Sequence, residues 1–184
     1  MNLEEIQIAE IIEKLSSLYK SKNYSEIKKI LTEFNPADIA VFFDEFSIEQ
    51  RILFFRLLPK EEAAETFVEL DNDTQEMLIH AFSDNELREV IDELYLDDTV
   101  DIIEEMPATI VKRILKSTDS QTRASINTLL KYPEDSAGSI MTPEFVDLKK
   151  TNTVEDAIKR IRRTGVDKET IYTCYVTDES RHLI

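Results

Sequence analysis

The sequence has few of the residues that interrupt regular structure, with two glycines, five prolines and one cysteine among 184 residues. An all-β sandwich needs many turns, so this shortage favours a mainly helical protein. The single cysteine, Cys174, cannot form an intrachain disulfide, which is typical of a reducing compartment. The sequence also lacks an apolar run of the roughly 18–20 residues that cross a bilayer, and no signal peptide follows Met1. These absences predict a soluble, cytosolic stretch of chain.

Basic residues are a minority of the charged residues, because 22 Lys and Arg face 38 Asp and Glu and give a formal net charge of −16. A surface this acidic repels nucleic acids and anionic lipids and attracts cations. We therefore expect no nucleic-acid partner and no direct contact with a membrane. Hydrophobic residues make up 42% of the chain, which is enough to form a core.

Large apolar residues recur every twelve positions over most of the chain. Each unit offers apolar residues at i, i+1 and i+4, which form one face of a helix. Three such series run along the chain, and one member of them, Thr66, is not apolar. We expect the aromatic members of all three series to lie in the core. The series are Phe42, Phe54, Thr66, Leu78, Val90 and Ile102; Phe43, Phe55, Phe67, Ile79, Ile91, Ile103 and Leu115; and Phe46, Leu58, Leu70, Phe82, Leu94 and Met106.

The boundaries between units follow the same period. Most residues at these positions are of types that begin helices, and Ser47 with Gln50 and Ser83 with Glu86 have the spacing of a capping box. We predict a right- or left-turning superhelix of short helices over about residues 35–130, with an amphipathic helix over Leu3–Tyr19 at one end. The boundary series is Asn35, Ser47, Pro59, Asp71, Ser83, Tyr95 and Pro107.

The segment Lys131–Val146 gathers two of the five prolines and one of the two glycines, Gly138, and it separates two patterns. After it we predict a strand over 144–148, a helix that Thr153 caps and Gly165 ends, a strand over 170–176 and a third strand from 181. A β–α–β unit whose next strand stops at Ile184 is interpreted as an incomplete α/β domain. The predicted domains are 1–130, a connecting joint at 131–143, and 144–184.

The run YPEDSAGSIMT at 132–142 resembles the joint of MgtE-family magnesium transporters, in which a superhelical N-terminal domain leads into a pair of CBS domains. Three further stretches agree with the family pattern: LLPKEEAAE at 57–65, FV at 145–146 followed by TVEDA at 153–157, and IYTCYVTD at 171–178. The resemblance covers essentially the whole chain. It implies an MgtE N domain followed by the start of the first CBS domain.

The resemblance also implies a function. Family members are homodimeric channels of the cell membrane whose transmembrane part conducts Mg²⁺, and Mg²⁺ between acidic faces of the cytoplasmic N and CBS domains holds the pore closed. This implies Mg²⁺ as the bound ion, the protein's own CBS and transmembrane domains as partners, and a place on the cytoplasmic side. This stretch alone is expected not to transport ions, and nucleotide binding of the kind some CBS pairs show would require both repeats.

Carboxylates are densest between residues 92 and 105, where Asp97, Asp101, Glu104 and Glu105 are spaced to share a helix face. Mg²⁺ is bound by one or two carboxylates and keeps several waters, so clustered carboxylates suit it. By resemblance, the ligands lie on the helix with Asp97, Asp98 and Asp101, and the joint adds a contact near Gly138. Asp135 and Glu105 are weaker candidates. Asp135 has the alternative role of capping the turn at 136–140.

Two other classes of function compete with an ion sensor. The first is a helical protein-interaction scaffold with incidental acidity. The second is an enzyme, which is disfavoured because no nucleophile, base or ligand triad is organised in the sequence. His80 and His182 lack a second histidine at ligand spacing and are interpreted as structural or exposed, and Cys174 as a core residue of the second strand.

Overall fold

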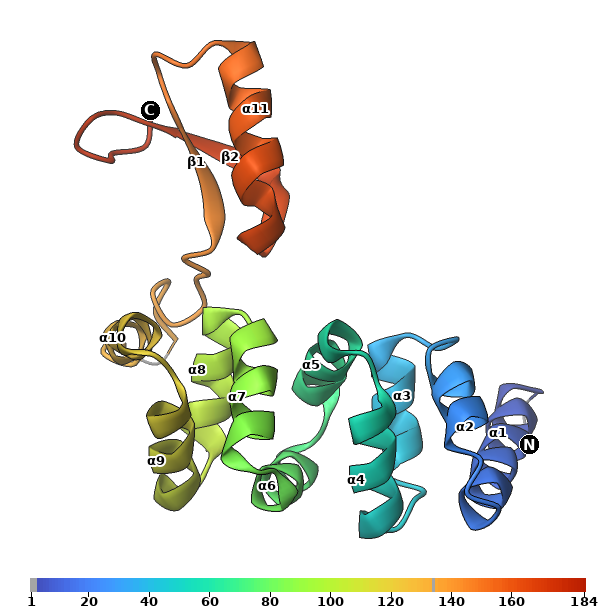
Figure 1. Cartoon of the computed structure of the whole chain (residues 1–184). Coiled ribbons are helices and arrows are strands. Elements are labelled where there is room, and N and C mark those ends of the chain that lie inside the picture. The colour runs from blue at the N-terminus through green and yellow to red at the C-terminus, as the bar shows by residue number, and fades with distance from the viewer. Residues whose placement is uncertain (1–2, 134) are drawn as a thin grey trace. The chain divides into compact units, whose positions relative to one another are not determined.

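The computed structural model describes residues 3–133 and 135–184, so Glu134 of the YPEDSAG run lies outside the described residues (Figure 1). Within those residues the chain is mainly helical with a small sheet, which confirms the predicted fold class. The elements are α1 (Leu3–Lys20), α2 (Tyr24–Leu31), α3 (Pro36–Phe43), α4 (Ile48–Leu57), α5 (Lys60–Glu69), α6 (Asn72–Ala81), α7 (Asp84–Glu93), α8 (Leu96–Glu105), α9 (Ala108–Ser117), α10 (Ser120–Leu129), β1 (Phe145–Lys149), α11 (Val154–Thr164) and β2 (Thr170–Thr177).

The twelve-residue period of the sequence is the period of the helices. From α4 to α10 each helix has ten residues and begins twelve residues after the one before it. The predicted capping boxes form at Ser47 and Ser83, where each side chain accepts from the backbone of the N3 residue and the N3 side chain accepts in return. Helix α2 was not among the predicted elements.

The apolar series that begins at Phe46 explains the sharp corners between helices. Leu58, Leu70 and Phe82 end α4, α5 and α6 in an extended conformation, with ψ between 145° and 150°. All three are buried, so the residue that breaks each helix is also a core residue. Burial therefore holds the chain in the extended conformation that stops one helix and leaves two residues before the next begins.

Alternate helices pack against one another. Contacts join α3 to α5, α5 to α7 and α7 to α9, and a second set joins α2 to α4 and α4 to α6. Phe43, Phe54 and Phe67 are fully buried between them, as predicted for the aromatic residues of the repeat. Such short helices are marginal alone, so burial on neighbouring helices supplies most of their stability.

Arginine side chains bind carbonyl groups at helix ends elsewhere in the array. Arg51 donates from Nε to the Phe46 carbonyl at 2.9 Å and from an Nη to the Asp44 carbonyl at 2.9 Å. Arg113 on α9 donates to the carbonyls of Ile79 and Phe82 at the end of α6. These contacts satisfy C-terminal carbonyls that a helix leaves without partners.

The chain divides into two units by its internal contacts. One unit holds residues 1–94 and 101–120, and the other holds residues 95–100 and 121–184. The first five residues of α8 therefore belong to the second unit, and the rest of α8 belongs to the first.

The second unit contains a two-stranded parallel sheet in which β1 pairs with β2, with α11 as the crossover. The third predicted strand appears as an isolated antiparallel bridge from Thr177 to Leu183. Cys174, predicted to be a core residue, is only half-buried. The difference follows from β2, on which Ile171, Tyr172 and Tyr175 are exposed.

Gly165 follows the last residue of α11, as predicted, but for another reason. Its φ of −72° is right-handed, and it continues into a short 3₁₀ turn over Gly165–Asp167. A Cβ at this position would lie 2.9 Å from Cγ2 of Ile171. The glycine is therefore explained by a close approach of β2 rather than by a left-handed helix end.

Candidate functional site

The first turn of α8 carries Asp97 and Asp98, two of the predicted metal ligands, and both are half-buried. Oδ1 of Asp97 is buried and has no hydrogen-bond partner among the residues that the structure describes. Burial raises the pKa of Asp97 to about 6, and the charges of Glu169 and Asp98 add to the rise. The negative charge of Asp97 is thus poorly compensated, which is the condition in which a cation stabilises a carboxylate most.

Asp101 and Glu105 lie further along α8, in the first unit, and both are exposed. Partial desolvation raises the pKa of Asp101, and the charge of Glu105, one helical turn away, raises it further. Asn72 on α6 donates a hydrogen bond from Nδ2 to the Glu105 carboxylate. The two predicted ligands therefore share a face of α8, and Glu105 already has a protein partner.

The joint brings Gly138 against the ring of Tyr132. A Cβ on Gly138 would overlap this ring, with Cε1 at 2.8 Å, so only glycine lets the ring lie there. The turn is held by Ser136, whose N–H donates to the Pro133 carbonyl at 3.1 Å, and by Ser139, whose N–H donates to the Ser136 carbonyl at 3.1 Å. The side chain at 138 is excluded by packing, and a metal contact there would have to come from the backbone.

Asp135 is exposed and has a φ of 60°. Aspartate tolerates this left-handed conformation better than most residues do. The backbone of the turn therefore gives a reason for aspartate at this position beside the predicted metal or capping roles.

Two acidic residues near α8 were not among the predicted site residues. Glu144 accepts a hydrogen bond at Oε2 from the backbone N–H of Leu96, the first residue of α8, at 2.8 Å. Glu169, just before β2, raises the pKa of Asp97 by its charge and donates its N–H to the Glu144 carbonyl at 3.1 Å. One signal in the sequence pointed here: Tyr95 stands in the boundary series where Asn, Ser, Asp or Pro stand in the other units.

The carboxylates of α8 do not belong to an enclosed metal site in the described residues. Among residues 3–133 and 135–184, no three His, Cys, Asp or Glu side chains are grouped so that they could hold a metal ion. Mg²⁺ takes one or two carboxylates and keeps its other positions for water. An ion bound by the α8 carboxylates would therefore have to keep most of its water ligands, because the described residues form no enclosing set of protein ligands.

Both histidines are exposed, as interpreted from the sequence. Nε2 of His80 is 3.5 Å from Glu76, and Nδ1 of His182 is 3.4 Å from Asp178. In the part of the chain that the structure describes, no helix combines the length and the apolar character that crossing a membrane requires.

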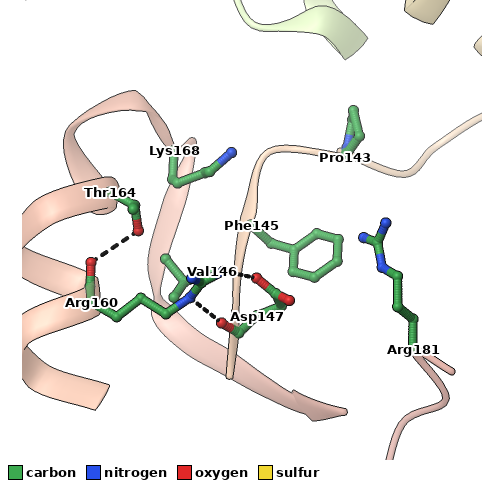
Figure 2. A pocket seen from close by; sticks show the side chains of 8 residues that line it. All are labelled: Pro143, Phe145, Val146, Asp147, Arg160, Thr164, Lys168 and Arg181. Carbon is green, nitrogen blue, oxygen red and sulfur yellow. Dashed lines mark hydrogen bonds and ion pairs between the residues drawn. The ribbon is translucent and has the colours of Figure 1, made fainter. Parts of the chain in front are cut away.

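A cavity of about 280 Å³ lies in the second unit beside β1 and α11 (Figure 2). Arg160 donates from Nε to the Asp147 carbonyl at 2.7 Å and pairs with the Asp147 carboxylate, which lowers the pKa of Asp147. Figure 2 shows Arg160 and Lys168 on one side of the cavity and Arg181 on the other. Because Asp147 offsets only one of these three cations, the lining carries an excess of positive charge.

A second cavity, of about 390 Å³, lies in the first unit between α4, α5 and α7. Its rim carries two ion pairs, Arg56 with Glu86 at 2.7 Å and Lys60 with Glu89 at 3.2 Å. The apolar part of its lining is Phe55, Leu58, Ala63, Phe82 and Val90. This cavity is the feature of the array that best fits the scaffold alternative.

Known proteins match this fold and this sequence. The family model of the MgtE intracellular N domain matches residues 34–135. The magnesium transporter MgtE of Thermus thermophilus is 37% identical over 85% of this chain, and that of Bacillus subtilis is 24% identical over 95%. The chain spans only 36% and 39% of these two relatives. A crystal structure of the cytosolic domain of the Mg²⁺ channel MgtE in complex with ATP matches 94% of this chain and 71% of its own, with a TM-score of 0.85 and 35% identity.

The fold and the matched region define the class of protein, which is an array of short helices that continues into a small α/β unit. The named relatives of this class are magnesium transporters and a channel rather than enzymes. The chain belongs to the MgtE family.

Proposed function

We propose that this chain is a Mg²⁺-sensing regulatory region of a magnesium channel. In this proposal the chain lies on the cytoplasmic side of the cell membrane as part of a homodimer. Residues 1–130 act as the N domain, residues 131–143 as the joint, and residues 144–184 as part of a CBS domain. Mg²⁺ bridges acidic faces of the N and CBS domains when it is abundant, and the protein's transmembrane domain is then closed.

The observation that carries this proposal is the first turn of α8, where Asp97 has a raised pKa and a buried Oδ1 with no hydrogen-bond partner in the described part of the chain. Two carboxylates about 4 Å apart repel by about 4 kcal/mol at an effective dielectric constant of about 20. A divalent cation between such groups reverses the sign of the interaction. Mg²⁺ therefore shifts a population of separated acidic faces toward a closed one, to the extent that it binds the closed state more tightly.

Asp98 and Asp101 are the side chains proposed to bind the ion directly, with Asp97 able to substitute for either. Gly138 is proposed to contribute through its backbone, because its packing on Tyr132 leaves no room for a side chain. Asp135 and Glu105 are weaker candidates, since Glu105 already accepts from Asn72.

The test is the response of the full-length protein to millimolar Mg²⁺. Mg²⁺ is expected to raise its melting temperature and to slow proteolysis of the joint, whereas K⁺ at equal ionic strength is not. The double substitution of Asp98→Asn with Asp101→Asn should abolish both effects. The matched control is Asp92→Asn with Glu93→Gln, which changes the charge by the same amount on α7. If both variants respond equally to Mg²⁺, the helical protein-interaction scaffold becomes the better explanation of this chain.

A second function is favoured by the cationic cavity of Figure 2 and by the ATP complex of the matched structure. Arg160, Lys168 and Arg181 offer donors suited to phosphate oxygens. We therefore include nucleotide binding by this region as a proposal. Isothermal calorimetry of the full-length protein, which would contain both CBS repeats, should show ATP binding that Arg181→Ala weakens. Inorganic phosphate tests whether the phosphates alone are recognised. Binding unchanged by Arg181→Ala would exclude this cavity.

A further inference from the structure

The N-terminus of α8 is capped differently from those of the two helices before it, α6 and α7. Asp71 and Ser83 cap α6 and α7 with their own side chains, three residues before the amide that they bind. Tyr95 holds the cap position of α8, since its carbonyl accepts the Thr99 N–H at 3.0 Å, but tyrosine is not a residue type that caps helices. The N–H of Leu96 instead donates to Glu144, 48 residues further along the chain.

Glu144 is held in place by its own backbone. Its N–H donates to Oγ1 of Thr142 at 3.1 Å, and its carbonyl accepts the N–H of Glu169 at 3.1 Å. The next residue, Phe145, begins β1. The carboxylate is therefore presented from a fixed point at the start of the sheet. A carboxylate at a helix N-terminus is stabilised by the helix dipole and by charge-assisted hydrogen bonds.

We propose that Glu144, which directly follows the joint, is a positioning residue that caps α8 and so ties the turn bearing Asp97 and Asp98 to the start of β1. The link itself is independent of any ion. Its regulatory meaning rests on the proposed function, because the turn that Glu144 holds is the one proposed to bind Mg²⁺.

The cap and the ion should support each other. Glu144 keeps the first turn of α8 helical, which holds Asp97 and Asp98 in one arrangement before an ion arrives. Mg²⁺ on these carboxylates in turn offsets their repulsion of the Glu144 carboxylate. Because coupling between two binding events is reciprocal, loss of the cap should weaken Mg²⁺ binding, and Mg²⁺ should partly restore helical structure in a variant without the cap.

The decisive experiment is amide hydrogen exchange of the 184-residue chain without Mg²⁺, resolved by residue. Glu144→Ala should speed exchange at Leu96 and, through fraying, at Thr99 and Val100, by about 2- to 30-fold. Glu144→Gln retains an acceptor oxygen and should show a smaller increase. Glu155→Ala is the matched control, because it removes the same side chain near the N-terminus of another helix, α11, where Glu155 pairs with Lys159 at 2.7 Å.

A second variant separates capping from general destabilisation. Adding Tyr95→Ser to Glu144→Ala supplies a local cap and should return exchange in α8 to near the original rate. Exchange at Leu96 and Val100 that stays within twofold of the original in Glu144→Ala would overturn the proposal. So would an equal increase in α7, or a failure of Tyr95→Ser to restore protection.

The response to Mg²⁺ is measured separately from the exchange rates without Mg²⁺. If the unsubstituted protein does not respond to Mg²⁺, the proposed sensing function fails, while the exchange result without Mg²⁺ still decides the role of Glu144. If the protein responds, Glu144→Ala should raise the Mg²⁺ concentration at the midpoint by at least severalfold. A midpoint that does not move would overturn the coupling.

Discussion

The residues before Glu144 and those from Glu144 to Ile184 differ in charge. The later stretch holds eight Lys or Arg and eight Asp or Glu, so its net charge is zero and the whole charge of −16 lies in the earlier stretch. They differ in burial as well. Phe43, Phe54 and Phe67 of the helical array are 0% exposed, whereas Tyr172 and Val166 of the α/β unit are 98% and 86% exposed.

The contrast separates the exposure of charge to cations from the formation of a stable core, which overall composition does not distinguish. The array keeps most of its carboxylates on the outside, with Asp97 as a half-buried exception, and closes a core between alternate helices. Most of its charge is therefore available to cations without weakening its packing. The α/β unit is electrically balanced and has few buried apolar residues among those described. Local stability should therefore be high in the array and low in the α/β unit.

The largest expected effect compares one aromatic residue from each region. Phe67→Ala removes a fully buried ring and should destabilise the protein by about 3–5 kcal/mol. Tyr172→Ala removes an exposed ring and should change stability by less than about 0.5 kcal/mol. Urea unfolding followed by circular dichroism measures both. Similar losses in the two variants would mean that Tyr172 is covered in solution.

The joint between the two regions should give the next largest effect. Gly138→Ala places a methyl group into the Tyr132 ring and should cost about 1–3 kcal/mol. Tyr132→Ala removes the obstacle, so the double variant should lose less than the two single losses together. The free energies of unfolding of the four proteins form the required cycle. Additive losses would exclude the contact as the reason for glycine.

One substitution, Asp97→Asn, tests whether the charge of Asp97 destabilises the protein. Asp97→Asn removes a charge whose ionised form is disfavoured by burial and by Glu169, and it should stabilise the metal-free protein near neutral pH by on the order of 1 kcal/mol. Asp92→Asn on the exposed face of α7 should change stability by less than about 0.5 kcal/mol. Thermal unfolding without Mg²⁺ measures both, and a loss of stability in Asp97→Asn would contradict the prediction.

The smallest effect concerns the pH dependence of a cap. Hydrogen bonding to the Ser83 backbone and to Arg56 lowers the pKa of Glu86 from 4.5 to about 2. The folded value lies below the unfolded one, so the stabilisation is present above pH 4.5 and is lost as the pH falls toward 2. Solvent screens this pair, which limits the contribution to less than about 1 kcal/mol. Urea unfolding between pH 2 and 4.5 should show a flatter pH dependence of the unfolding free energy in Glu86→Gln. An unchanged pH dependence would contradict this prediction.

Much of the fold could be predicted from local pattern. The twelve-residue period, the caps at Ser47 and Ser83 and the β–α–β order all depend on neighbours within one or two turns of chain. The contact of Glu144 with Leu96 joins residues 48 positions apart, and nothing in a single sequence states which turn meets which. The same holds for Glu169 beside Asp97 and for Arg113 at the end of α6.

The candidate site was predictable only in part. Asp97, Asp98 and Asp101 followed from carboxylate spacing and from a family resemblance, and their role as ligands stays a prediction. Gly138 was also selected by resemblance, but its reason, the ring of Tyr132, required coordinates. Tyr95 interrupts the boundary series in the sequence. A tyrosine at a helix N-cap position indicates that another residue caps the helix, and in α8 that residue is Glu144.

The extended apolar residues that end α4, α5 and α6 set the length of these three units at twelve residues. An insertion of one residue within a helix would rotate all later positions of that unit by about 100°, moving its apolar face away from the neighbours. An insertion of twelve residues would keep every later unit in phase. The array can therefore lengthen or shorten during evolution only in whole units, much as other repeat proteins do.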